Sequence, residues 1–178
     1  VAKDASLEVL YVVKGEAETG GLNLLTEVKA AENANVVFKK VQLLSEGVQQ
    51  IEHRYSQLAA NSKVEYLNVE LGSGESFLHY TQDLVGEEAH IVHDLAYLGD
   101  NNQKFDISML MSHVHLNPSA IFMYSVRWAT MQKNHPRYLG TLFAAVLLPK
   151  VRKKILVYYL IRLLNPYLYR YCFVKKTM

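Results

Sequence analysis

The chain has 178 residues, of which 50% are hydrophobic and 20% charged. That composition excludes a disordered or collagen-like chain, and the length suits one domain with a substantial core. The single cysteine excludes an intrachain disulfide and a metal site built from several cysteines of this chain, and it favours a reducing compartment. The first ten residues show no signal-peptide pattern.

The formal net charge of +2 conceals a strong asymmetry along the chain. Residues 1–106 carry all 17 acidic residues but 8 of the 19 basic ones, whereas residues 107–178 carry 11 basic residues and no acidic one. Seven of the 12 tyrosines also lie beyond residue 120. The chain therefore has two compositions that one uniform domain does not explain.

Seven strand-like runs, in which apolar and polar residues tend to alternate, follow one another in the first two thirds of the chain. They cover residues 7–13, 34–44, 48–58, 63–71, 76–85, 90–98 and 104–116. Short turns of small or polar residues, such as AANS at 59–62 and GSGES at 72–76, precede several of these runs. We expect glycine and asparagine to supply the backbone freedom at such corners.

The strand-like runs recur with a constant step. The small residues that open five of them are separated by 28, 28, 14 and 13 positions, and these residues are Ser6, Ala34, Ser62, Ser76 and Ala89. The basic step is therefore about 14 residues, which suits a repeat of strand and turn rather than a helical heptad. The same step predicts further strand starts at Gly20 and Val48, and others near Gln103 and Asn117.

Two all-β architectures fit evenly spaced strands with tight turns. A sandwich or barrel is built of hairpins, but the Asn-Gly and Asp-Gly dipeptides typical of hairpin turns are absent between the runs. In a β-solenoid each coil stacks on the previous one and buries a continuous core, which the constant step favours. A solenoid predicts inward side chains in vertical columns, namely Val9, Val36, Phe38, Val64, Tyr66, Leu78, Ile91 and Leu95.

Residues 7–125 carry an ordered set of features that resembles one known family. A turn of acidic and small residues leads into a strand that ends at Gln42, in AENANVVFKKVQ. Further along, the ordered residues are Tyr97, Leu98, Gly99, Gln103, Asp106, His113 and Ser119. This stretch is similar to the SufB/SufD family, the scaffold proteins of the SUF iron–sulfur cluster assembly system. The lack of cysteine in it is more similar to SufD than to SufB.

The resemblance implies a right-handed parallel β-helix over residues 1–125 and a scaffold rather than an enzyme. It implies assembly with a SufB-type subunit and a SufC-type ATPase in the cytoplasm, with self-association through the β-helix end as a further option. The iron–sulfur cluster would then belong to the complex, and no cofactor would be bound by this chain alone. We expect no nucleic-acid partner and no membrane span.

Residues 126–178 leave this pattern and form a basic, tyrosine-rich tail. One interpretation is a genuine tail whose apolar runs, 139–149 and 155–164, are too short to span a bilayer and lie on a membrane surface as amphipathic helices. The other is out-of-frame translation. When residues 137–151 and 166–178 are back-translated and read from the third base of each codon, the shifted frame can encode other sequences. These are a Phe-Arg-Gly strand and a strand with Pro, Ile, Leu and acidic residues, both similar to the family's next segments. We favour the second, because it also explains the loss of acidic residues.

Few residues qualify as candidates for a site. His113 and His115 form a His-x-His pair that a strand would point to one face, as in cupin-type metal sites, but no acidic third ligand follows them. A cupin-like metal-dependent enzyme is therefore a competing hypothesis, although two strand-face histidines without a metal are the more common arrangement. Cys172 has no nearby histidine to activate it. The basic run KVRKK at 150–154 is more often a solvated surface than a membrane- or nucleic-acid-binding module.

Overall fold

The computed structural model describes the backbone of residues 1–98, 103–113, 121–132, 135–147, 155–164 and 167–176, and side chains as far as residue 112. The solenoid strands are β1 (Ser6–Gly15), β2 (Gly20–Ala30), β3 (Asn35–Leu44), β4 (Val48–Leu58), β5 (Lys63–Glu70), β6 (Glu75–Leu84), β7 (His90–Tyr97) and β8 (Lys104–His113). They are followed by β9 (Ile121–Gln132), β10 (His135–Leu147), β11 (Ile155–Leu164) and β12 (Tyr167–Lys176).

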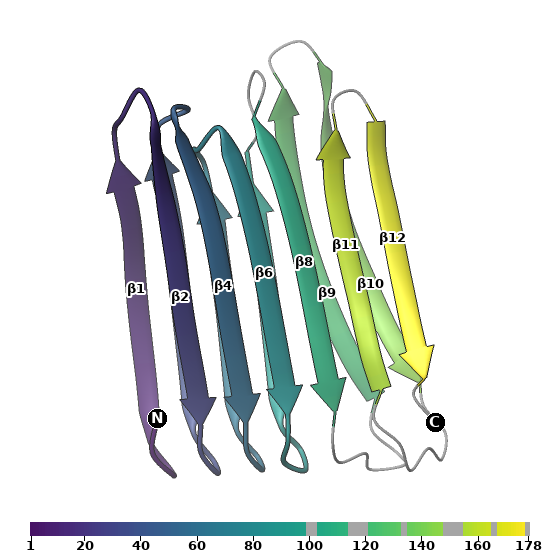
Figure 1. Cartoon of the computed structure of the whole chain (residues 1–178). Helices are drawn as coiled ribbons and strands as arrows, with labels where there is room; N and C mark the ends of the chain where they lie inside the picture. The colour runs from purple at the N-terminus through teal and green to yellow at the C-terminus, as the bar shows by residue number, and fades with distance from the viewer. Residues whose placement is uncertain (99–102, 114–120, 133–134, 148–154, 165–166, 177–178) are drawn as a thin grey trace.

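The first eight strands form a flattened β-solenoid of about four turns. Successive strands alternate between two parallel sheets, so that β1, β3, β5 and β7 make one sheet and β2, β4, β6 and β8 make the other. The second sheet faces the viewer in Figure 1. Each coil therefore contains two strands, and the step of about 14 residues is half a coil. The hairpin alternative is wrong, because β5 and β6 lie in different sheets.

The strand-like runs up to residue 98 are confirmed, as are the strand starts predicted at Gly20, at Val48 and near Gln103. The start predicted near Asn117 and residues 114–116 of the last run lie outside the described residues. The predicted inward columns are also confirmed. Val36, Val64 and Ile91 are in register on neighbouring strands and at most 4% exposed. The other predicted core side chains are buried, except that Val9 is partly buried at the end of the stack. Alternation along each strand thus fixes which side chains enter the space between the sheets.

The corners use asparagine and glycine for different reasons. Asn33 and Asn61 adopt φ angles of 58° and 54°, in the left-handed region that asparagine tolerates, whereas none of the described glycines has a positive φ. The glycines instead allow close approach of backbones. A Cβ on Gly72 would lie 1.9 Å from the carbonyl oxygen of Leu44. The expectation that glycine supplies conformational freedom at the corners is therefore wrong for this solenoid.

The last third of the chain changes from parallel to antiparallel pairing. β9 pairs with β10, and β11 pairs with both β12 and the edge of β8. The amphipathic-helix interpretation of residues 139–149 and 155–164 is wrong, because these apolar runs fall largely in β10 and β11. In the described backbone, β11 covers the strand edge at which the second sheet of the solenoid would otherwise end.

Candidate functional site

The space between the two sheets holds a cluster of ionised side chains as well as apolar ones. Lys40 from β3 lies between two carboxylates, Glu52 from β4 and Glu70 from β5, and its Nζ is 2.7 Å from Glu70 Oε1. Arg54 pairs with the other oxygen of Glu52. All four side chains are at most 1% exposed. We call these four residues the ionic cluster, and its two cations and two anions balance one another.

A chain of amide groups continues the ionic cluster toward one end of the coils. Gln50 donates to Glu52 and accepts a hydrogen bond of 2.7 Å from Gln42. The side-chain oxygen of Gln42 in turn accepts from the backbone N–H groups of Leu44 and Gly72, at 3.2 and 2.9 Å. These hydrogen bonds therefore connect the side chains of Gln42 and Gln50, which lie between the sheets, to the backbone of the corner that follows β5.

On its other side the ionic cluster reaches a buried histidine. Asn68 accepts from Arg54 at 3.0 Å and lies 2.6 Å from His93 Nε2. Because Asn68 uses its oxygen toward Arg54, its N–H donates to Nε2 and the ring proton sits on Nδ1. Nε2 of the Gln82 amide lies 2.9 Å from Nδ1, so a neutral ring protonated at Nδ1 has an acceptor there only if the Gln82 amide is turned to present its oxygen.

Aromatic rings surround the guanidinium of Arg54. Its central carbon lies 4.7 Å from the ring centroids of Phe38 and Tyr66 and 5.0 Å from that of Tyr80. Each contact is within the range in which a ring face attracts a cation, and the effect is larger when the cation is desolvated. The Tyr66 hydroxyl is 2.7 Å from Ser56 Oγ, so the ring also contributes to the hydrogen-bonded network.

Burial shifts the pKa values of Glu70 and His93 in the directions that disfavour charge. Burial raises the pKa of Glu70 above its usual range, although the Lys40 ammonium opposes this shift. Burial, assisted by the positive charge of Arg54, lowers the pKa of His93 well below its usual range. His93 is therefore neutral at physiological pH and can accept the hydrogen bond that Asn68 donates to Nε2.

The network has the chemistry of a structural element. Its ionised groups are paired with one another, and no described group of three or more His, Cys, Asp or Glu residues could hold a metal ion. It links β3, β4, β5, β6 and β7, which belong to three successive coils. The part of the chain that the structure describes holds no helix of the length and hydropathy that a membrane span requires.

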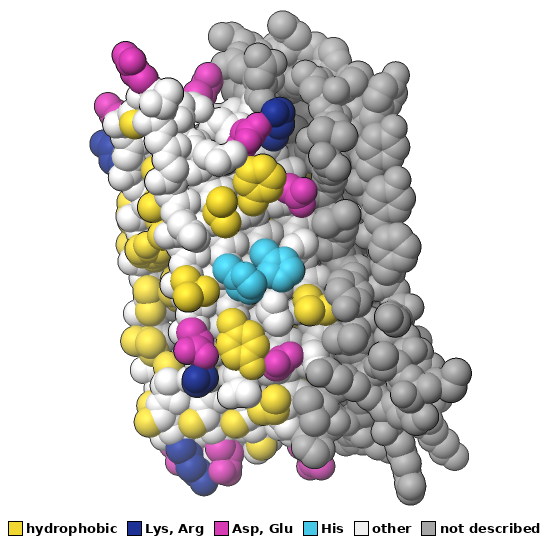
Figure 2. All heavy atoms as spheres, in the orientation of Figure 1, with side chains coloured by type: hydrophobic (Ala, Val, Ile, Leu, Met, Phe, Trp, Pro, Cys, Tyr) yellow, Lys and Arg dark blue, Asp and Glu magenta, His cyan; other side chains and the backbone are white. Residues whose placement is uncertain are grey.

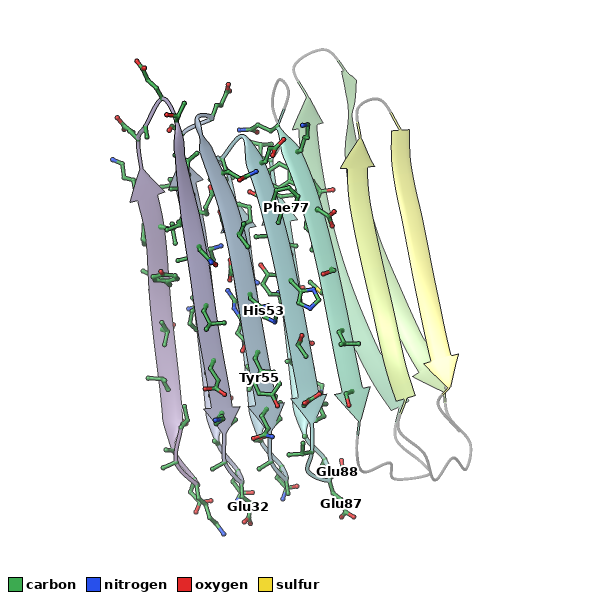
Figure 3. The ribbon with its side chains drawn as sticks, viewed as in Figure 1. Glu32, His53, Tyr55, Phe77, Glu87 and Glu88 are labelled. Atoms are coloured by element: carbon green, nitrogen blue, oxygen red, sulfur yellow. The ribbon has the colours of Figure 1, made fainter. Side chains whose placement is uncertain are left out.

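The outer face of the β2–β4–β6–β8 sheet carries a second histidine arrangement that the sequence analysis did not single out. His53 and His79 are in register on β4 and β6, with ring centroids 4.7 Å apart, and His79 Nδ1 contacts the hydroxyl of Ser108. The paired rings lie near the middle of this face in Figure 2, and Figure 3 shows His53 between Tyr55 and Phe77. Partial burial and the neighbouring His53 lower the pKa of His79.

The predicted site residues fall mostly outside the described side chains. His113 is the last residue of β8, with only its backbone described, and His115 lies outside the described residues. Cys172 belongs to β12 by its backbone, and KVRKK at 150–154 lies outside the described residues. A metal site at His113 and His115 therefore stays a prediction, as does the reading that no residue of this chain is catalytic.

A sequence family described as "SUF system FeS cluster assembly, SufBD core domain" matches residues 1–126. The chain belongs to the SufB/SufD core-domain family. Its role therefore lies in iron–sulfur cluster assembly by the SUF system. No curated protein matches the chain. The match ends where the parallel solenoid has ended and the antiparallel strand β9 has begun.

Sequence reasoning missed the ionic cluster, although a signal for it was present. Val36 and Phe38 were predicted to point inward, and strict alternation along the same strand carries Lys40 and Gln42 to the same side. A lysine at an inward position requires a buried carboxylate nearby, which here comes from the next two strands.

Proposed function

We propose that the chain is a SufD-like scaffold subunit of the SUF complex and acts by assembly with a SufB-type subunit and a SufC-type ATPase in the cytoplasm. The observation that carries the proposal is that the SufBD core domain matches a solenoid whose buried ionic side chains pair with one another. Because the interior is filled, the outer surfaces and the strand edges of the solenoid are the parts that can bind other proteins. The absence of cysteine from residues 1–126 favours the SufD type.

Strand edges support a role in assembly. The backbones of β1 and β2 form the first coil, and in the described residues each has a strand partner on one side only. Such an edge presents backbone N–H and C=O groups that a strand from another chain can satisfy. The iron–sulfur cluster is the cargo of the complex in this proposal and requires no cluster ligand from this chain.

Binding to a SufC-type ATPase tests both the function and the origin of residues 126–178. In this family the C-terminal domain docks the ATPase, and a standard interface needs about 20–30 correctly placed residues on each side. We expect the 178-residue chain to capture the ATPase weakly, and a chain continued in the alternative reading frame to capture it strongly. Equal capture by both chains in a pull-down at micromolar concentration would show that the tail is genuine. Capture by neither would contradict the scaffold proposal.

A further inference from the structure

The outer face of the β2–β4–β6–β8 sheet carries a pair of histidines that the scaffold role does not use. His53 on β4 and His79 on β6 lie in the same row of the sheet, because they are register partners on neighbouring parallel strands. Both side chains are exposed, and their rings lie near the middle of this face (Figure 2). The two strands belong to successive coils, so an ion shared by the two rings would join one coil to the next.

The separation of the two rings suits a shared metal ion. Their centroids are 4.7 Å apart and their planes are inclined by 69°. A zinc–nitrogen bond is about 2.1 Å long, which puts each ring centroid about 3.2 Å from the ion. At the angles of about 90–109° that octahedral and tetrahedral ions impose, two such centroids are about 4.5–5.2 Å apart. The sheet therefore already holds the rings at the required spacing, and χ2, a torsion with broad preferences, sets where each ring nitrogen points.

Ser108 on β8 supports the His79 ring from the other side of the row. Its hydroxyl contacts Nδ1 of His79. Metal-bound histidines usually donate their second ring N–H to such a supporting group, which fixes the ring and leaves the lone pair of the other nitrogen for the ion. The Thr81 hydroxyl lies 3.4 Å from Nε2 of His79, beyond the ~3.2 Å of a normal hydrogen bond, so it competes weakly for that lone pair. The lowered pKa of His79 also keeps the ring neutral near pH 7, as a metal ligand must be.

The nearest outward positions around the two histidines carry no charge. By register, the neighbours in the same row, and those on β4 and β6 in the rows on either side, are Leu25, Ser108, Ile51, Phe77, Tyr55 and Thr81. No ammonium or guanidinium group at these six positions repels a cation. No carboxylate lies at them either, which agrees with the lack of a group of three or more ligand residues among the described side chains. The protein therefore supplies two ligands, and water completes the coordination of a bound ion.

We propose that His53 and His79 bind one divalent transition-metal ion of the Zn²⁺ and Cu²⁺ class on the outer face of the solenoid. Imidazole nitrogen is a preferred ligand of these ions, whereas Mg²⁺ and Ca²⁺ prefer oxygen ligands. The positions occupied by water make the ion exchangeable and open to a ligand from another molecule, unlike the closed four-ligand sites that serve structure alone. This binding site goes beyond the scaffold role and does not depend on it.

Calorimetric titration with zinc chloride tests the proposal, with magnesium chloride as the control. The parent chain for this series is the 178-residue chain with His113→Ala and His115→Ala, because that pair is a separate metal-site prediction. We expect the parent chain to bind one Zn²⁺ and no Mg²⁺. His53→Ala and His79→Ala should each weaken Zn²⁺ binding at least about tenfold. The matched control His90→Ala, which removes an exposed histidine of the opposite sheet, should leave it unchanged. In the wild-type chain the same substitutions should remove one equivalent of bound Zn²⁺.

Two further measurements test the geometry of the site. Ser108→Ala should weaken Zn²⁺ binding about tenfold, and Ser108→Thr, which keeps the hydroxyl, should retain the parent affinity. Electron paramagnetic resonance of bound Cu²⁺ should show two histidine nitrogen ligands in the parent chain and one in His53→Ala. Far-UV circular dichroism of each variant shows whether the solenoid has folded.

Three results would count against the site. A folded parent chain that binds no Zn²⁺, or an affinity that either His53→Ala or His79→Ala leaves unchanged, would overturn the proposal. Zn²⁺ binding by the wild-type chain that is lost in the parent chain would assign the ion to His113 and His115 and would overturn it as well. An unchanged affinity in Ser108→Ala would overturn the supporting role of that hydroxyl.

Discussion

Replacement of Lys40 by methionine is the most informative perturbation of the solenoid interior. Methionine has a similar length, so the packing changes little while one ammonium is removed. In the described contacts Glu52 keeps its pairing with Arg54, but Glu70 loses its cation. Breaking a buried ion pair by removal of one partner costs about 3–5 kcal/mol because an uncompensated charge remains buried. We therefore expect Lys40→Met to lower the free energy of unfolding by about this amount.

The neighbouring residue provides a matched control. Lys39 lies on the same strand and also pairs with a glutamate, but its side chain is 43% exposed and its partner Glu8 is 65% exposed. Exposed pairs of this kind contribute about 0–1 kcal/mol. Lys39→Met should therefore change the free energy of unfolding by less than about 1 kcal/mol. The difference between the two substitutions isolates the effect of burial from the loss of a lysine.

Urea unfolding followed by far-UV circular dichroism measures both effects, provided that the denaturant slope is the same for each variant. Adding Glu70→Gln to Lys40→Met should recover much of the loss, because the second substitution removes the carboxylate left unpaired by the first. This recovery would appear as non-additivity in a double-mutant cycle. A cost below about 1 kcal/mol for Lys40→Met, or additive effects of the two substitutions, would refute the account of the ionic cluster.

Folding lowers the pKa of His93, so below about pH 6.5 the unfolded chain binds more protons than the folded one. The free energy of unfolding should therefore decrease as the pH is lowered through this range, by up to about 1.4 kcal/mol per pH unit. His93→Gln should reduce this slope in urea titrations at several pH values, and an unchanged slope would exclude His93 as its source. Tyr66→Phe removes the 2.7 Å hydrogen bond to Ser56 and should cost about 1–3 kcal/mol in the same assay, whereas a neutral effect would mean that the buried hydroxyl finds another partner. Gly72→Ala should lower the melting temperature because its Cβ would lie 1.9 Å from a carbonyl oxygen, while Gly21→Ala, with no atom within 4 Å, should not; equal effects would contradict the close approach.

The sequence alone was sufficient to predict the solenoid because its signal is local. Alternation and the constant step depend on short stretches, and they located strands as inconspicuous as the one that begins at Gly20. The ionic cluster was harder because its members are separated in sequence. Lys40 and Glu70 are 30 residues apart and meet only because one coil stacks on the next. To predict such a pair one must know the register between successive coils, and the strand pattern of a single coil does not contain that information.

The corners and residues 126–178 show two other limits of prediction from the sequence. The choice between a positive φ and a close backbone approach depends on which atoms of the neighbouring coil lie beneath the turn, as for Gly72 and Leu44. For residues 139–149 and 155–164, apolar composition alone suits either an amphipathic helix or a strand. β10 pairs with β9, and β11 pairs with the edge of β8, so both runs form strands largely along their length. These partner strands are tertiary features that the composition of either run does not contain.

Co-purification with a SufB-type subunit tests the scaffold proposal most directly. The 178-residue chain and a tagged SufB-type subunit would be expressed together, and the stoichiometry of the purified complex would be measured. Our account predicts a defined complex with the wild-type chain and its loss in a variant with a disrupted solenoid, such as Lys40→Met with Arg54→Met. Failure of the wild-type chain to co-purify, while circular dichroism shows it to be folded, would contradict the proposal that this solenoid is a SUF assembly scaffold.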